Sequence, residues 1–550
     1  MKNIYFLCAL FFAFACQQEQ KPETTIQPWV AYDESKELAE NADHESDKMR
    51  FRLIQSRISD KNKLWEDIGD QIKFFSEEDY QALSSLILEQ SIPTIQNHIE
   101  KGDLTYEKLT QWYLYRIVKY ENDSGKYLNN IIAINPNAVK EAQKKDKDRS
   151  GQEHPLYGMP VLLKDNVNFG GVPTSAGTHL LRNNMAEDAF IVDRIQEKGG
   201  IILGKTNLSE WANYLCLDCP NGYSAVGGQT LNPYGRKVFD TGGSSSGSGS
   251  SIAANYAVAA IGTETSGSIL SPSSSNAIVG LKPTTGLLSR DGIVPLSSTL
   301  DTPGPMTKSV IDNAILLSAL TGEDQNDSAT LGSPTDVTYW EDLASGSLAG
   351  VRVGVNKSFI DDSIYRENVD KIVTLGATAI EFDPKQIDFD GFGELLNADM
   401  KIDLPKYLEK YANEEIAIRS VAEIVNYNQT DSLDKIPYGQ GRFAGILDTD
   451  LSKEELIQLR ARLRKEGVSF FEEAMSEHEL DFVLSINNWN AGHAAMANYP
   501  CITVPMGYRA DGQPVGVTFI SRPFEEEKLL RVGYAFEQAT KVRRLPQDYQ

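Results

Sequence analysis

From Gly158 onward, short apolar runs alternate with helix-patterned segments, and this alternation restricts the possible folds more than any other feature of the chain. The run Val161–Leu163 is wholly apolar, which is typical of a buried strand. Residues 189–198 then carry the spacing of a short helix that two glycines close, and residues 201–203 are apolar again. A strand, a helix and a second strand in this order predict an α/β sheet.

Later segments continue this pattern. Residues 309–320 predict a helix, because Ser309 and Asp312 have the spacing of a capping box. The stretch 322–480 is rich in helical patterns, and we expect it to carry elements that shape a substrate site. Strand patterns and a last helix then return, at 501–504, 515–520 and 525–540. We expect these last strands to rejoin the same sheet.

The length and charge of the chain limit its class. A chain of 550 residues with 41% hydrophobic content can bury a large core, and no Pro- or Gly-rich linker divides its middle. One enzyme-sized body is therefore predicted, preceded by a helical lead-in at 49–103. The net charge of -24 repels phosphate groups, so we expect a well-solvated acidic surface and no nucleic-acid partner.

The N-terminus has the pattern of an export signal. Met1-Lys2-Asn3 precede an apolar run from Ile4 to Ala15, which matches the positive start and short apolar core of a secretory signal. The run is shorter than the roughly 20 apolar residues that a bilayer span needs. We predict a signal peptide at 1–15.

Cys16 directly follows this apolar run. A small residue before a cysteine resembles a bacterial lipoprotein signal, in which the cysteine becomes lipidated, although Ala13 stands where such signals more often carry leucine. We therefore expect Cys16 to be a lipid anchor, 16–48 to be a flexible polar tether, and the protein to be exported to a bacterial cell envelope, in the periplasm or at the outer membrane. Ordinary secretion and an uncleaved anchor are the alternatives.

Cys216 and Cys219 have the spacing of a metal knuckle or a redox pair. No second pair of ligands stands near them, so a zinc site is not expected. A local disulfide in an oxidising compartment and two free thiols both remain open.

The densest unusual segment is Asp240-Thr-Gly-Gly-Ser-Ser-Ser-Gly-Ser-Gly-Ser-Ser. Such composition alone is typical of a flexible linker. The apolar stretch 252–261 follows at once, however, which favours a turn whose glycines let the backbone approach a reacting group. A phosphate-binding loop would need a Gly-Lys-Ser/Thr ending, which this segment lacks.

A second turn of small residues follows, Gly262-Thr-Glu-Thr-Ser-Gly-Ser. Its glycine could let backbone N–H groups converge beside Ser268, as an oxyanion hole requires. A serine hydroxyl becomes a useful nucleophile only when a base removes its proton. The turn therefore predicts a nucleophile whose base must be found elsewhere.

Lys164 is the best-placed base. Histidines 154, 179 and 493 are the ones in patterned regions, and none has a recognisable Ser-His-Asp context, so we expect them to be structural. Lys164 ends the strand at 161–163, where apolar surroundings favour the neutral amine. The alternative for a strand-end lysine is that it reaches solvent or pairs with Asp165.

The context of Lys164, the Gly-Gly-Ser-Ser loop and the Gly-Thr-Glu-Thr-x-Gly-Ser-Ile turn together resemble the amidase signature family of Ser-cisSer-Lys hydrolases. Ser244 and Ser268 are 24 residues apart, which is the usual separation in that family. The resemblance covers 104–544, and residues 243–249 and 262–265 look most like the peptide amidase branch. It implies a large mixed, twisted β-sheet covered by α-helices on both faces.

The resemblance also implies a role for each matching residue. Ser268 would be the nucleophile, and Ser244, preceded by a cis peptide bond, would relay its proton to neutral Lys164. Ser245 would support this network by hydrogen bonding. The oxyanion hole would be formed by backbone N–H groups of Thr265, Ser266, Gly267 and Ser268. No cofactor and no metal are implied.

Two positions depart from the family pattern. Leu270 stands where many members have an arginine that pairs with the acid matching Glu264, so Glu264 must find another partner or water. Ser266 stands where glycine or aspartate is common, which changes the entrance to the oxyanion hole.

The resulting prediction is an exported amidase of linear carboxylic amides, such as peptide C-terminal amides, fatty amides or aryl amides. Its partners would be a small-molecule or short-peptide amide and, through the lipid anchor, a membrane. One alternative is a lipid-anchored binding protein that kept the fold and lost turnover. Another is the amidase subunit of the glutamyl-tRNA amidotransferase, which the export signal disfavours because that role needs cytosolic tRNA.

Overall fold

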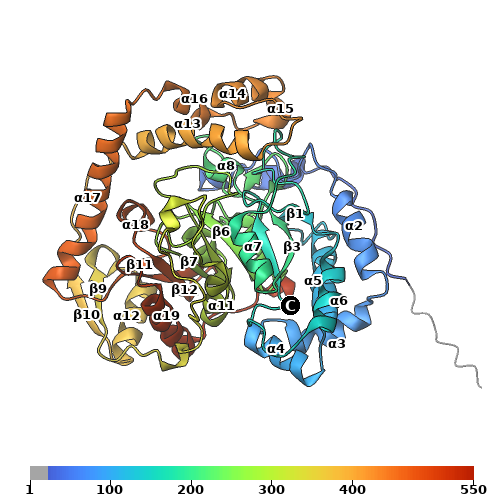
Figure 1. Cartoon of the computed structure of the whole chain (residues 1–550), viewed down its shortest axis with the longest axis horizontal. Helices are drawn as coiled ribbons and strands as arrows, with labels where there is room; N and C mark the ends of the chain where they lie inside the picture. The colour runs from blue at the N-terminus through green and yellow to red at the C-terminus, as the bar shows by residue number, and fades with distance from the viewer. Residues whose placement is uncertain (1–22) are drawn as a thin grey trace, which may run out of the picture.

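A single mixed sheet forms the centre of the computed structural model, which describes residues 23–550 (Figure 1). The predicted signal peptide and Cys16 lie outside these described residues. The sheet has eleven strands in the order β1-β3-β2-β6-β8-β7-β12-β13-β11-β9-β10. Their bounds are β1 Ile131–Ile134, β2 Pro160–Lys164, β3 Ile201–Thr206, β6 Ala259–Glu264, β7 Val279–Lys282, β8 Thr302–Thr307, β9 Arg352–Asn356, β10 Thr378–Phe382, β11 Phe482–Ile486, β12 Cys501–Tyr508 and β13 Pro514–Ile520; β4 Tyr223–Ser224 and β5 Gly228–Gln229 form a separate hairpin.

The first half of the sheet brings two sequence motifs to one edge. β2 runs parallel to β6, with Val161 opposite Ala259 and Leu163 opposite Ile261. Parallel neighbours end at the same edge of a sheet. Lys164, at the end of β2, therefore lies beside the turn that follows β6.

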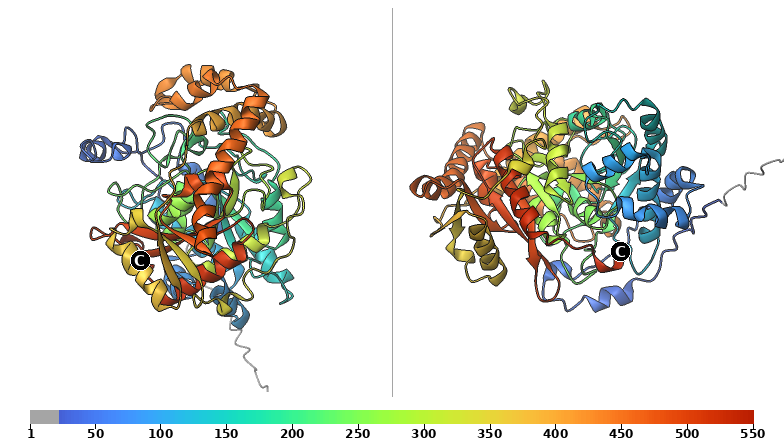
Figure 2. Two further views of the ribbon diagram at one scale, coloured as in Figure 1. Left: turned by 90° about the vertical axis from the view of Figure 1, so that its left-hand side faces the viewer. Right: turned by 90° about the horizontal axis from the view of Figure 1, so that it is seen from below.

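Helices cover both faces of the sheet, as the two further views show (Figure 2). The α/β class, the strands predicted at 161–163, 201–203, 501–504 and 515–520, and the return of the chain end to the same sheet are confirmed. The helices that cover the sheet or flank the site are α7 Phe190–Glu197, α8 Glu210–Asn213, α9 Ser246–Ala253, α10 Leu270–Ser275, α11 Val310–Leu320, α12 Ser363–Thr374, α18 Ala491–Ala497 and α19 Glu526–Thr540.

The predicted capping box at α11 forms only in part. The Ser309 side chain accepts the Asp312 N–H, as expected. The Asp312 carboxylate instead accepts the N–H of Ile92 at 2.7 Å, so it ties the lead-in to α11.

The region 322–480 contains two strands that its helical patterns conceal. β9 and β10 pair in parallel, and β10 ends the sheet at its outer edge. Four of the five residues of β10 are partly or wholly exposed, so only Phe382 supplies a buried apolar side chain. An edge strand with so little apolar character has a weak sequence signal.

The helices of this region form a separate layer, which lies above the sheet in Figure 1. Their apolar faces pack into a cluster of their own together with residues near Trp211 and Leu296. The layer consists of α13 Phe392–Tyr411, α14 Val421–Gln429, α15 Ser432–Lys435 and α16 Gly441–Asp448, and the long helix α17 Lys453–Glu477 leads from it to β11 and packs against α18.

The N-terminal segment corrects one expectation, because the described part of the predicted tether is held on the fold. The Glu34 carboxylate accepts the N–H of Gln55 at 2.8 Å, and the rings of Trp29 and Tyr32 pack edge-on against Tyr127. The polar composition suggested a free tether, but these aromatic contacts hold the segment against the body of the protein. The helices here are α1 Ser35–Glu40, α2 Asn62–Gly69, α3 Glu77–Ile87, α4 Ile92–Lys101, α5 Tyr106–Glu121 and α6 Ala138–Asp148.

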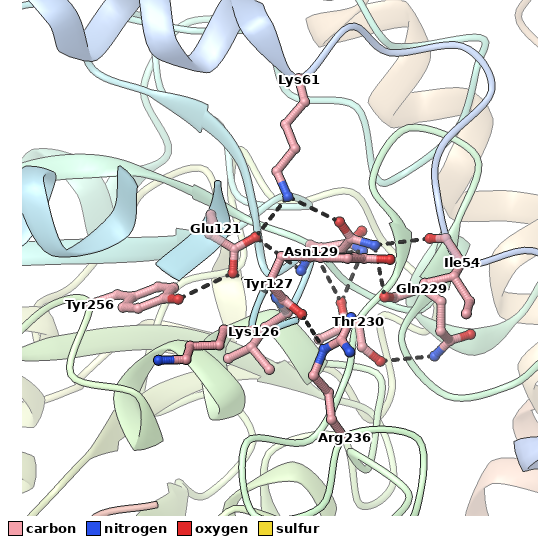
Figure 3. Close-up of polar contacts among 12 residues, drawn as sticks. Ile54, Lys61, Glu121, Lys126, Tyr127, Asn129, Gln229, Thr230, Arg236 and Tyr256 are labelled. Atoms are coloured by element: carbon pink, nitrogen blue, oxygen red, sulfur yellow. Dashed lines mark hydrogen bonds and ion pairs between the residues drawn. The ribbon is translucent and has the colours of Figure 1, made fainter. Parts of the chain in front are cut away.

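Figure 3 shows how Lys61 clamps this segment to the body. Its ammonium group lies 3.3 Å from the buried carboxylate of Glu121, which also accepts the hydroxyl of Tyr256. The Asn129 side chain donates to the carbonyl of Ile54 at 2.9 Å. Charge and hydrogen bonding thus join the lead-in to α5 and to the loop before β1.

Replacing Glu121 by alanine should lower the free energy of unfolding by about 3 kcal/mol, because it removes the charge partner of Lys61 and the acceptor of three other donors. The urea midpoint of the purified protein measures the loss. Glu77→Ala is the matched control: it removes an exposed pair with Lys119 and should cost less than about 1 kcal/mol. Equal losses in the two variants would mean that the buried contacts of Glu121 stabilise the fold no more than an exposed ion pair does.

No helix within residues 23–550 is long and apolar enough to cross a bilayer.

Candidate active site

Lys164 is wholly buried at the end of β2, and its Nζ lies 2.7 Å from the Ser244 Oγ. The same nitrogen is 2.8 Å from the Thr263 Oγ1 and 3.1 Å from the Thr263 carbonyl oxygen. Burial lowers the pKa of Lys164 to about 7, although the charges of Asp301 and Glu264 oppose this. A neutral amine can donate two N–H groups to Thr263 and keep its lone pair for the Ser244 proton.

Ser244 lies in a tightly packed loop that enters α9. The peptide bond between Gly243 and Ser244 is cis, and the Ser244 carbonyl accepts the N–H of Ser209 at 3.0 Å. A Cβ on Gly243 would come within 2.7 Å of the Ser209 Oγ and 3.0 Å of the Asn221 Oδ1. A larger residue at this position would have to displace both side chains, which explains one of the glycines in this segment.

Ser245 connects this loop to both β6 and Ser268. Its N–H donates to the Ser268 carbonyl at 3.2 Å, and its Oγ donates to the Thr263 carbonyl at 3.1 Å and accepts the Thr263 N–H at 3.2 Å. Lys164, Ser244, Ser245 and Ser268 are therefore gathered at one edge of the sheet. Of these, Ser268 is the most exposed, at 8%, and the other three are at 0%.

The backbone N–H groups of the turn that carries Ser268 are the candidate oxyanion donors. Gly267 has φ +88°, where a glycine is favoured, and α10 begins shortly afterwards. In the described part of the chain, the N–H groups of Thr265, Ser266 and Gly267 donate to no protein acceptor. They are therefore available to a developing oxyanion.

Glu264 finds its partners in the main chain. One of its carboxylate oxygens accepts the N–H groups of Ile269 and Leu270 at 2.8 and 3.0 Å. The carboxylate thus binds the start of α10, and the arginine expected from the family pattern is not needed for this contact.

Two residues that contact candidate site residues were not predicted as functional. Thr263 binds the lysine, and Asp301 accepts a hydrogen bond from the Thr265 hydroxyl. Asp301 belongs to the segment Asp301-Thr-Pro-Gly-Pro-Met, which lies within the resemblance and was the available signal.

The competing interpretations of the site are not supported by the geometry. Asp165 pairs with Lys205, at 3.2 Å, and not with Lys164. His154, His179 and His493 each pack against an aromatic ring, and burial lowers the pKa of each to about 4. In the described part of the chain, none of the three hydrogen-bonds to Lys164, Ser244 or Ser268, and their structural role stays a prediction.

A cavity of about 250 Å³ adjoins the site on the side of Thr263 and Thr265. The helical layer supplies part of its wall through α13, at Tyr407 and Tyr411. Its other apolar lining residues include Ile293, Val294, Pro295 and Leu296. A second hollow of about 600 Å³ lies near Ser266 and is lined by Phe389, Phe470, Trp489 and His493.

A sequence model of the amidase family matches residues 108–530, well over half of the chain. The chain belongs to the amidase signature family. As an amidase, it is a hydrolase of carbon–nitrogen bonds.

Solved structures agree with this assignment and with the predicted amidase signature fold. An amidase family protein from Bacillus anthracis superimposes with a TM-score of 0.86 at 36% identity, over 90% of this chain and 99% of that one. The peptide amidase of Stenotrophomonas maltophilia gives a TM-score of 0.78 at 35% identity, over 84% and 99%. A probable amidase of Arabidopsis thaliana is 35% identical over 480 residues, which are 84% of this amidase and 92% of the relative.

The cysteine pair and the acidic, histidine and cysteine side chains bear on disulfide and metal chemistry. Cys216 and Cys219 are joined by a disulfide, which decides between the two possibilities left open by their spacing. Residues 23–550 hold no group of three or more His, Cys, Asp or Glu side chains that could bind a metal ion.

Proposed function

We propose that this amidase is an exported hydrolase of linear carboxylic amides that works through an acyl-enzyme on Ser268. The observation that carries the proposal is the buried Lys164 amine, 2.7 Å from the Ser244 hydroxyl. The next residue, Ser245, donates its N–H to the carbonyl of Ser268. A lysine whose pKa is about 7 is neutral in a large fraction of molecules near neutral pH, so it can act as a base where an exposed lysine cannot.

The reaction follows from these positions. Lys164 takes the proton of Ser244, and Ser244 takes that of Ser268 as its oxygen attacks the amide carbon. The carbonyl oxygen becomes negative and is stabilised by the N–H groups of Thr265, Ser266 and Gly267. The carbon–nitrogen bond then breaks, and the proton passes back through Ser244 to the leaving amine or ammonia.

Water completes the cycle by the same route in reverse. Lys164 and Ser244 remove a proton from the water as it attacks the acyl carbon, and the Ser268 oxygen leaves and regains its proton. The products are a carboxylic acid and an amine, so no cofactor is consumed.

Linear amides are proposed as substrates for two reasons. The 35% identity to a peptide amidase extends over 84% of the chain, and the cavity beside Thr265 has a mainly apolar lining that also includes polar and charged side chains. A purified protein assayed against peptide C-terminal amides, fatty amides and aryl amides tests the proposal. Release of ammonia or amine from at least one class, together with fluorophosphonate labelling, is expected. Absence of both in the folded protein would instead favour the binding-protein alternative.

Export and lipid anchoring are proposed from the sequence of residues 1–16. The disulfide between Cys216 and Cys219 is consistent with an oxidising compartment outside the cytosol. Such a location also disfavours the amidotransferase role, which needs tRNA.

Cys16→Ser tests the anchor in a bacterial host. The wild-type chain should incorporate labelled palmitate and sediment with membranes, whereas the variant should lose the label and move to the soluble or periplasmic fraction. Cys501→Ser, at a buried free thiol, is the control and should leave the label in place. Unchanged labelling of the Cys16 variant would exclude this residue as the anchor.

A further inference from the structure

Asp301 stands immediately before β8 and joins the nucleophile turn to a neighbouring loop. Its Oδ1 accepts the hydroxyl of Thr265. Its Oδ2 accepts the N–H groups of Leu296 and Ser297, both at 2.8 Å. Thr265 is one of the three residues whose N–H groups have no protein acceptor in the described part of the chain. A single carboxylate therefore holds this end of the candidate oxyanion turn.

The same carboxylate acts on the base through space. Burial raises the pKa of Asp301 to about 6, so the group is mainly ionised near neutral pH. Its negative charge is the largest of the influences that raise the pKa of Lys164 against the effect of burial, and Glu264 is the next. Asp301 therefore contacts the oxyanion turn and, by its charge, favours the protonated form of the lysine.

Other charged groups near this carboxylate are already paired with one another. Arg290, which faces Asp301, is bound to Asp327 at 2.6 Å. The remaining pairs around the cavity and the base are Asp403 with Lys406, Asp291 with Lys410, and Asp165 with Lys205. The Glu264 carboxylate is held by two N–H groups of α10. Asp301 is thus the carboxylate that binds the turn through Thr265, lines the cavity, and acts by its charge on Lys164.

Resting on the function proposed above, we propose that Asp301 is a positioning residue that orients the oxyanion turn through Thr265 and sets the protonation of Lys164 through its charge. The first effect acts on the transition state, because the oxyanion exists only there. The second acts on the fraction of enzyme whose base is neutral. A residue with a purely structural role would produce neither a selective loss of kcat nor a shifted pH profile.

Asp301→Asn removes the charge and one acceptor while it keeps the size of the side chain. We expect kcat to fall about 10- to 100-fold with KM changed less than about twofold. The acid limb of the kcat/KM profile should move to lower pH by about half a unit or more, because loss of a nearby negative charge disfavours the lysine ammonium.

Thr265→Val separates the two effects and does not require the aspartate variant to fold. It removes the hydrogen bond to Asp301 and keeps both the charge and the Asp301 contacts to Leu296 and Ser297. The variant should lose kcat to a similar extent with an unmoved acid limb, and Thr265→Ser should restore most of the loss.

Asp399→Asn is the matched control. This buried carboxylate binds the hydroxyl of Ser297 in the same loop but has no contact with the turn, so kcat and the acid limb should remain as in the wild type. The proposal is overturned if Asp301→Asn behaves like Asp399→Asn, or if Thr265→Val retains wild-type kcat. Failure of the proposed function is distinguishable, since Ser268→Ala would then turn over as fast as the wild type.

Discussion

Ser268→Ala is expected to lower kcat by about 10⁴-fold or more, because no acyl-enzyme can form without the hydroxyl oxygen. The side chain accepts no structural hydrogen bond in the described part of the chain, and its neighbours are held through the Ser268 carbonyl, which the variant keeps. The melting temperature should therefore stay close to that of the wild type. Release of ammonia from a peptide amide and labelling by a fluorophosphonate both measure the effect.

Ser271→Ala provides the control for this experiment. Ser271 lies three residues later on α10 and is attached to the turn through its backbone N–H, which donates to the Gly267 carbonyl at 2.7 Å. Its turnover and labelling should be those of the wild type. Labelling that survives in Ser268→Ala and disappears in another serine variant would place the nucleophile elsewhere.

Lys164→Met should lower kcat/KM at pH 7 by about 10³-fold, because it removes the base and leaves the Ser244 hydroxyl without a proton acceptor. In the wild type, kcat/KM should rise as pH rises through about 7, since the lysine is active when it has lost its proton. The variant should lack this limb, and its residual activity should depend only weakly on pH in this range. A pH profile of kcat/KM from about 5 to about 9, which brackets the lysine pKa, measures both outcomes.

Lys308→Met tests whether any buried lysine would give the same result. Burial lowers the pKa of Lys308 to about 8, but its nearest acceptor is the carbonyl of Ala257, away from the catalytic serines. We expect this variant to lose stability and to keep the limb near pH 7. A limb that persists in Lys164→Met would assign the titration to another group.

The strands that the sequence predicted lie in surroundings that leave little choice of residue. β2 and β3 are buried at every position, and the apolar runs 161–163 and 201–203 within them are typical of buried strands. β10 lies at the outer edge of the sheet and was missed, because an exposed strand is free to carry polar residues. The described part of the predicted tether was misjudged for a related reason: Trp29 and Tyr32 pack against Tyr127, which is distant in the sequence.

Some residues of the candidate site were likewise recognisable from the sequence, and others were not. Ser244 and Ser268 lie in short turns of small residues, whose motifs and spacing are recognisable in the amino-acid sequence alone. Asp301 and Thr263 act through contacts across strands, and α13 reaches the cavity from a region without a distinctive pattern. Such contacts depend on which strands become neighbours.

The sequence by itself determined the α/β class, the positions of four strands of the sheet (β2, β3, β12 and β13) and, through motifs that resemble the amidase signature family, a lysine and two serines that could perform acyl transfer. Local patterns carry this information, since burial selects apolar runs and close backbone turns select glycine and serine. Only the tertiary structure decided that Lys164 lies 2.7 Å from Ser244, that Glu264 binds the start of α10, and that Asp301 faces both the turn and the base. These relations arise from pairing between strands far apart in the chain, which lowers the local dielectric and brings charges together in ways that no short stretch of sequence encodes.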